Sequence, residues 1–189
     1  MLIYIHGFNS SPASHKAKLL RERLVALSRE ALFSSPALSD LPSAAIELLQ
    51  SEVGLYPASV VTLVGSSLGG FYATWLAEKF GVRAVLVNPA VTPHMGLRAY
   101  LGPQQNLYTG ARYTLTEQHL RELAALDVAS PTHLDRYFLM VTTGDEVLDY
   151  RDAVRKYAGA QQLVIQGSDH GFSDFGEHVD SVLQFAGIL

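Results

Sequence analysis

The sequence of 189 residues contains no cysteine. Disulfides, thiolate metal sites and cysteine nucleophiles are therefore excluded, and a reducing compartment is compatible with this composition. No stretch approaches the roughly 18 consecutive apolar residues of a membrane-spanning helix. The N-terminus, Met1-Leu2-Ile3-Tyr4, lacks both the basic segment and the apolar length of a signal peptide. We therefore expect a cytoplasmic protein without a membrane span.

Positive charge is also scarce. Fourteen lysines and arginines stand against eighteen aspartates and glutamates, which gives a net charge of −4 and disfavours bulk attraction to nucleic acid or anionic membranes. Hydrophobic residues make up 48% of the chain and charged residues 17%, a balance typical of globular proteins rather than disordered ones. The length predicts one domain over residues 1–189. We expect no nucleic-acid partner, and the composition leaves the oligomeric state open.

Short apolar segments alternate with longer segments of helical periodicity. The expected strands are residues 2–5, 60–64, 84–87, 137–141 and 163–165, with 31–33 as a weaker sixth. The expected helices include residues 20–27, 46–53, 71–80 and 176–185. This alternation predicts the α/β class, with a reduced, mostly parallel sheet covered by helices on both faces.

Residues 91–135 interrupt this rhythm and form an expected insertion, rich in glycine, proline and tyrosine. Thr114-Leu115-Thr116-Glu117 matches a capping box and predicts a helix behind it. Insertions of this length often serve as lids or binding loops, and the alternative is a structural excursion that covers the sheet edge. Its tyrosines either line an apolar acyl site or pack ordinarily: Tyr100, Tyr108 and Tyr113.

A G-x-S-x-G pattern, Gly65-Ser66-Ser67-Leu68-Gly69, follows the expected strand 60–64 and opens a helical segment. This is the context of a nucleophile elbow. A serine in a sparsely allowed backbone conformation needs glycines two positions before and two after it, so that strand and helix can approach each other. Gly65 and Gly69 meet this requirement for Ser67, whereas Ser66 would need glycine at Val64 and Leu68. The register therefore selects Ser67 as the nucleophile.

A serine hydroxyl needs a general base, and that base needs a group that orients it. His170 lies in the glycine-flanked loop directly after the last expected strand, at the carboxyl end where α/β proteins assemble their sites. The other histidines lack a partner motif. Asp145 is the first carboxylate after the expected strand 137–141, and we predict that it is the acid of the triad. Asp149 is the alternative, although its position suits the N-cap of the next helix.

An oxyanion hole requires two preorganised donors. The N–H of Leu68 directly follows the nucleophile, and the N–H of Phe8 lies in the loop after the first strand. We expect His6 to support this loop through hydrogen bonds rather than to act in catalysis. The metal-binding pattern H-E-x-x-H is absent, so we expect neither a metal nor another cofactor.

These features together resemble the α/β-hydrolase superfamily, and His6-Gly7-Phe8-Asn9-Ser10-Ser11 resembles its small YqiA-like esterases in particular. Further matching strings are Gly65 to Gly70, Val87-Asn88-Pro89-Ala90, Tyr108-Thr109-Gly110, Thr143 to Arg151 and the His170 loop. The resemblance implies a serine esterase that hydrolyses small-molecule acyl esters, or thioesters such as acyl-coenzyme A, through an acyl-enzyme intermediate. The triad order Ser67, Asp145, His170 is that of this superfamily.

The sequence bears on three further interpretations. A binding or interaction protein could keep the hydrolase fold after losing catalysis. A dinucleotide-binding domain is disfavoured, because the motif G-x-G-x-x-G starting at Gly65 would need glycine at position 67, where this chain has serine. A basic cluster early in the chain either meets a phosphorylated carrier such as coenzyme A or forms a solvated helix face, and the second is favoured: Lys16, Lys18, Arg21 and Arg23.

Overall fold

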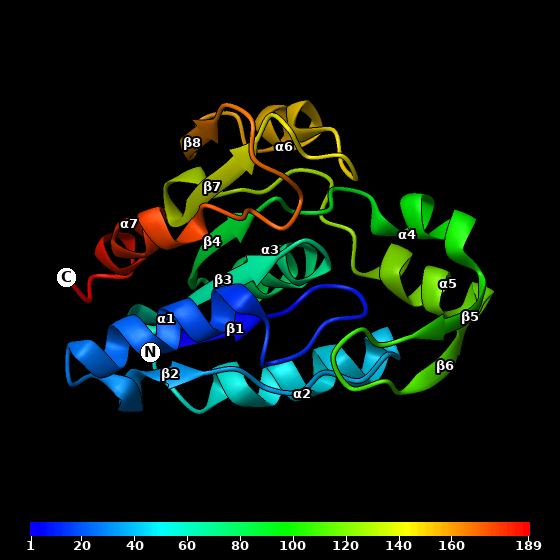
Figure 1. Cartoon of the computed structure of the whole chain (residues 1–189), viewed down its shortest axis with the longest axis horizontal. Helices are drawn as coiled ribbons and strands as arrows, with labels where there is room; N and C mark the ends of the chain where they lie inside the picture. Colours follow the sequence, from blue (N-terminus) through cyan, green and yellow to red (C-terminus); the bar gives the residue numbers. More distant parts are fainter.

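Six parallel strands form a central sheet in the order β2-β1-β3-β4-β7-β8 (Figure 1). The computed structural model describes residues 1–189. The strands are β1 (Leu2–Ile5), β2 (Phe33–Ser34), β3 (Thr62–Ser66), β4 (Arg83–Val87), β7 (Tyr137–Thr142) and β8 (Gln161–Ile165). The five stronger expected strands are therefore present, but the weaker sixth, 31–33, is shifted, because Glu30–Leu32 form a 3₁₀ turn and only Phe33 belongs to β2. This strand is a two-residue edge strand that pairs with Leu2 and Ile3.

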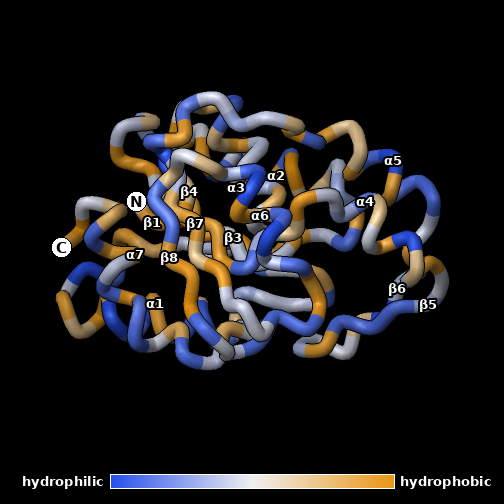
Figure 2. Tube along the Cα trace, turned by 90° about the horizontal axis from the view of Figure 1, so that it is seen from above, coloured by the Kyte–Doolittle hydropathy of each residue, from blue (hydrophilic) through white to orange (hydrophobic).

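Helices cover both faces of this sheet, as predicted. On one face lie α1 (His15–Ala26) and α7 (Val179–Phe185), and on the other lie α2 (Pro42–Gly54), α3 (Leu68–Phe80) and α6 (Tyr150–Lys156). Side chains alternate along β1. Leu2 and Tyr4 pack in the hydrophobic core beneath α1 and α7, and Ile3 and Ile5 pack in the core beneath α2, α3 and α6. Figure 2 shows hydrophobic residues gathered along the central strands. No helix has both the length and the apolar character needed to cross a membrane.

Short 3₁₀ turns complete the connections between these elements. They are Glu30–Leu32, Ala58–Val60, Leu97–Tyr100, Leu134–Arg136 and Phe175–His178. The last of these turns leads directly into α7, so the expected helix 176–185 is split into a 3₁₀ turn and an α-helix. Gly81 follows α3 with φ +69° and forms a left-handed C-terminal cap.

The insertion gathers at the end of the molecule opposite the two termini (Figure 1). It contains α4 (Pro93–Gly96), the antiparallel hairpin of β5 (Gly102–Gln105) and β6 (Arg112–Leu115), and α5 (Glu117–Ala125). The hairpin is tied to the loop after β1, because Leu107 N–H donates to the Asn9 carbonyl at 3.0 Å and the Asn106 amide donates to the Ser10 carbonyl at 2.8 Å. The insertion is thus attached directly to the loop that carries Phe8.

The predicted capping box was wrong by two residues. Thr114 lies within β6, where it pairs with Pro103, so it cannot begin a helix. The N-cap of α5 is Thr116, and His119 rather than a glutamate closes the box by accepting from the Thr116 N–H at 3.2 Å. The histidine ring replaces the carboxylate that the usual sequence pattern specifies. The helix expected behind this motif is present as α5.

Candidate active site

Ser67 lies at the sharp turn between β3 and α3, with φ 53° and ψ −118°. This conformation is rare for a residue with a side chain and is typical of a nucleophile elbow. The flanking glycines explain how the turn closes. A Cβ at Gly69 would lie 2.0 Å from the carbonyl oxygen of Ile5, and a Cβ at Gly65 would lie 2.3 Å from the carbonyl oxygen of Gly69. The turn therefore depends on both glycines for close backbone contact.

Three side chains predicted from the sequence meet at the carboxyl end of the sheet. His170 Nε2 lies 3.1 Å from Ser67 Oγ, and His170 Nδ1 lies 2.8 Å from Asp145 Oδ2. The Asp145 side chain is only 2% exposed. Its other oxygen accepts the N–H groups of Val147 and Leu148, each at 2.8 Å. Asp145 is thus fixed by its own loop with one oxygen directed at the imidazole.

Asp149, the alternative acid, has a different environment. It is exposed and caps α6 by accepting from the Arg151 N–H at 3.0 Å. The Arg151 guanidinium also donates to both of its carboxylate oxygens, and these hydrogen bonds lower the pKa of Asp149. The contacts therefore favour Asp145 as the partner of His170, and the role of Asp145 stays a prediction.

Two residues that the sequence analysis did not select hold the His170 loop. Asn88 follows β4 with φ 41°, and its buried amide donates to the carbonyl oxygens of Asp169 and His170, both at 3.2 Å. Glu146 accepts the N–H of His170 at 3.0 Å. A polar residue directly after a buried strand is the signal that could have identified Asn88, because such residues often hydrogen-bond neighbouring loops.

The loops that carry the acid and the base are also joined to each other. The N–H of Gly144 donates to the Gly167 carbonyl at 2.8 Å, and the N–H of Gly167 donates to Thr143 Oγ1 at 2.9 Å. A Cβ at Gly144 would lie 2.2 Å from the Ser168 carbonyl oxygen, so this contact requires glycine. The distance between Asp145 and His170 is therefore maintained by backbone as well as side-chain contacts.

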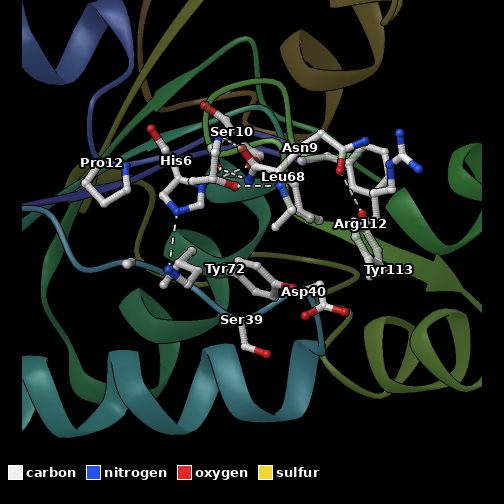
Figure 3. Close-up of a pocket in the computed structure, with 18 residues that line it drawn as sticks. His6, Asn9, Ser10, Pro12, Ser39, Asp40, Leu68, Tyr72, Arg112 and Tyr113 are labelled. Carbon is white, nitrogen blue, oxygen red and sulfur yellow. Dashed lines mark hydrogen bonds between the residues drawn. The ribbon is translucent and has the colours of Figure 1, made fainter. Parts of the chain in front are cut away.

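The two residues predicted to supply the oxyanion donors, Phe8 and Leu68, both line the cavity beside Ser67. The N–H groups of Phe8 and Leu68 make no hydrogen bond within the protein, and Leu68 begins α3, where backbone N–H groups point outward. His6 supports the Phe8 loop as expected: its ring lies 3.1 Å from the Gly7 carbonyl and accepts the Leu38 N–H at 3.3 Å (Figure 3). Burial lowers the pKa of His6, which favours a neutral ring suited to both contacts.

Two chambers open on Ser67 and His170. The larger, of about 550 Å³, is lined mainly by apolar residues such as Pro89, Val91 and Leu97, and we call it the apolar chamber. The smaller, of about 300 Å³, is lined by Lys16, and we call it the Lys16 chamber. Ser67 lies at the junction of the two, so that each chamber could receive one side of a substrate.

The three tyrosines of the insertion are distributed over different cavities. Tyr100 lines the apolar chamber, whereas Tyr108 lines the Lys16 chamber. Tyr113 lies behind the Phe8 loop in a separate pocket of about 240 Å³ and donates to Asn9 Oδ1 at 2.9 Å (Figure 3). No three histidines, aspartates or glutamates are grouped so as to hold a metal ion.

Comparison with solved structures identifies the fold. Mouse alpha/beta hydrolase domain-containing protein 10 superimposes with a TM-score of 0.74 at 16% identity, covering 97% of this chain and 89% of the mouse chain. The esterase domain of a Rhodothermus marinus protein superimposes with a TM-score of 0.61 at 16% identity, covering 97% and 85%. The chain therefore has the α/β-hydrolase fold that the sequence predicted.

Comparison of sequences identifies the family. A UPF0227 protein of Pectobacterium carotovorum is 25% identical over an alignment of 193 residues that covers 98% of each chain. The family model of UPF0227 matches residues 1–187. This chain belongs to UPF0227, which is described as an uncharacterised protein family.

Proposed function

We propose that this protein is a serine esterase that hydrolyses small-molecule acyl esters. The observation that carries the proposal is the continuous series of contacts from Ser67 Oγ through the His170 imidazole to the Asp145 carboxylate, at 3.1 and 2.8 Å. Phe8 and Leu68 line the cavity beside Ser67, and their backbone N–H groups have no acceptor within the protein. A nucleophile, a base, an orienting acid and oxyanion donors are the parts that acyl transfer needs.

The proposed reaction has two steps. With the imidazole proton on Nδ1, His170 donates to Asp145, and its Nε2 takes the hydroxyl proton as Ser67 Oγ bonds to the ester carbonyl carbon. The oxyanion is stabilised by the N–H groups of Phe8 and Leu68. The carbon–oxygen bond to the alcohol then breaks, and the alcohol leaves with the proton from His170. Water, activated by the same imidazole, hydrolyses the acyl-enzyme and restores Ser67.

The size and lining of the apolar chamber support an acyl chain as its occupant, because apolar walls favour burial of an aliphatic or aromatic group. The names of the structural neighbours, which include a hydrolase domain protein and an esterase domain, are consistent with this chemistry. Thioesters such as acyl-coenzyme A pass through the same type of intermediate and belong in the substrate panel.

A fluorophosphonate probe tests the proposal directly, since it reacts with serines activated by a neighbouring base. We expect stoichiometric labelling of the purified protein, mapped by mass spectrometry to the peptide containing Ser67, together with turnover of short-chain p-nitrophenyl esters. Tight binding of an acyl compound without labelling or turnover would instead favour a binding protein that keeps this fold.

The choice between the two candidate acids can be tested by matched substitutions. We expect Asp145→Asn to lower kcat by roughly 10³- to 10⁴-fold, because an amide cannot hold the imidazole in the required tautomer or stabilise its charge. Asp149→Asn, which retains a capping side chain, should change kcat less than about threefold. Steady-state kinetics with one p-nitrophenyl ester compare the two, and the reverse order would assign the acid to Asp149.

A further inference from the structure

A buried cation lines the smaller chamber at Ser67. Lys16, in the first turn of α1, is 8% exposed, and its ammonium donates to the carbonyl oxygen of Gly171 at 2.5 Å. An ammonium has three donors, and Gly171 is its one acceptor within the protein. Charged groups removed from water are normally paired and fully hydrogen-bonded. Two donors of Lys16 therefore remain for a partner from outside the chain.

Another lysine of this protein illustrates the usual arrangement. The Lys156 side chain is also largely buried, and its ammonium faces Asp127 Oδ1 at 3.6 Å. Lys16 has no such ion pair. Asp145 and Asp169 act on its charge from a distance, but Asp145 is bound to His170 and Asp169 accepts from Ser173. Burial lowers the pKa of Lys16 to about 8, so the ammonium is still mostly protonated at neutral pH.

The two chambers differ in the charged groups of their linings. No aspartate or glutamate lines the Lys16 chamber, whose other polar side chains include Tyr4, Ser14 and His15. The apolar chamber has two carboxylates in its lining, Asp149 and Asp152, and each is already ion-paired with an arginine, Arg151 and Arg155. The Lys16 ammonium has no such ion pair, so an anionic group is attracted to the Lys16 chamber.

We propose that Lys16 binds a carboxylate on the alcohol part of the ester, while the acyl chain occupies the apolar chamber. The assignment rests on the proposed esterase function and extends it to a substrate class, the acyl esters of small hydroxy acids. The single cation matches one negative charge, and its two free donors match the two oxygens of a carboxylate. Both chambers contact His170, which must protonate the departing alcohol.

A pair of esters with the same acyl group tests this assignment. O-butyrylglycolate and O-butyrylglycolamide have nearly the same shape, and only the first carries a negative charge. We expect the wild type to show a kcat/KM about 10- to 100-fold higher for the glycolate, the range of a hydrogen bond to a charged group. Lys16→Met should reduce this ratio to near one. Lys18→Met, which removes an exposed lysine two residues away, is the matched control and should keep the ratio.

The ratio of kcat/KM for the two esters distinguishes a role of Lys16 in binding the substrate from a role in supporting the protein structure. If Lys16 only positions the His170 loop through Gly171, Lys16→Met will lower kcat/KM equally for both esters, and the assignment is overturned. A wild-type ratio near one overturns it as well, even if Lys16→Met does not fold. Preference for monoethyl succinate over ethyl butyrate, without preference for the glycolate, would place the anion on the acyl side and contradict the proposal.

Failure of the esterase function itself would look different. In that case neither butyryl ester would be hydrolysed and the fluorophosphonate probe would leave Ser67 unlabelled, so both proposals would be rejected together. Labelling of Ser67 with equal turnover of the two esters would reject the role of Lys16 alone.

Discussion

Replacing Ser67 by alanine should lower kcat for ester hydrolysis by roughly 10⁵- to 10⁶-fold, the scale seen when the nucleophile of a catalytic triad is removed. The substitution removes the one oxygen that contacts His170 Nε2 and leaves no atom to carry the acyl group. Ser67 is only partly buried and alanine fits the same backbone, so the free energy of unfolding should change by less than about 0.5 kcal/mol. Stopped assays with p-nitrophenyl butyrate and urea denaturation measure the two quantities.

Ser59→Ala provides the control, because Ser59 is exposed at the opposite end of β3 and its loss should leave turnover unchanged. Full turnover by Ser67→Ala would contradict the assignment of the nucleophile. If Ser66→Ala lost turnover and Ser67→Ala kept it, the nucleophile would be Ser66 rather than Ser67.

The largest effect on stability is expected for Gly69→Ala. The new Cβ would lie 2.0 Å from the Ile5 carbonyl oxygen and 2.9 Å from that of His6, and both are backbone atoms that cannot rotate away. Helix α3 would have to move off β1, at a cost of at least about 3 kcal/mol. Thermal and urea denaturation should show a large loss of stability or an insoluble protein.

Gly54→Ala is the matched control for this substitution. Gly54 is the last residue of α2, and a Cβ there would meet no atom within 4 Å. Because alanine favours helix more than glycine does, this variant should be as stable as the wild type or up to about 1 kcal/mol more stable. Equal stability of the Gly69 and Gly54 variants would show that α3 and β1 are not in close contact.

The strands were predictable because each central strand is buried on both faces and is therefore apolar throughout. Their limits were less certain. Val60 belongs to a 3₁₀ turn rather than to β3, and it is 48% exposed. It was included in the expected strand 60–64 because it is apolar like the residues that follow it. The edge strand β2 gave a weak signal because only two of its residues pair with the sheet.

The candidate site residues were predictable because of their positions in the loops that follow the strands. Ser67 directly follows β3, and Asp145 and His170 lie in the loops that follow β7 and β8. The carboxyl ends of parallel strands lie at one edge of the sheet, so these loops are brought together. The burial of Lys16 was not predictable, and the expectation of a solvated face was wrong for this residue, while Lys18 and Arg21 are exposed. Helical periodicity describes a helix by itself, whereas Lys16 is covered by a loop 155 residues further along the chain.

The attachment of the β5–β6 hairpin to the Phe8 loop bears on how the site admits substrate. A lid that is attached only by flexible hinges can open a pocket without moving the residues around the reacting atoms. Here the hairpin holds Asn9 and Ser10, the residues directly after Phe8, through Leu107, Asn106 and Tyr113. Outward movement of the hairpin must therefore either break these bonds or displace the Phe8 N–H. Under the proposed mechanism, in which the Phe8 N–H stabilises the oxyanion, opening of the hairpin would therefore also disturb catalysis.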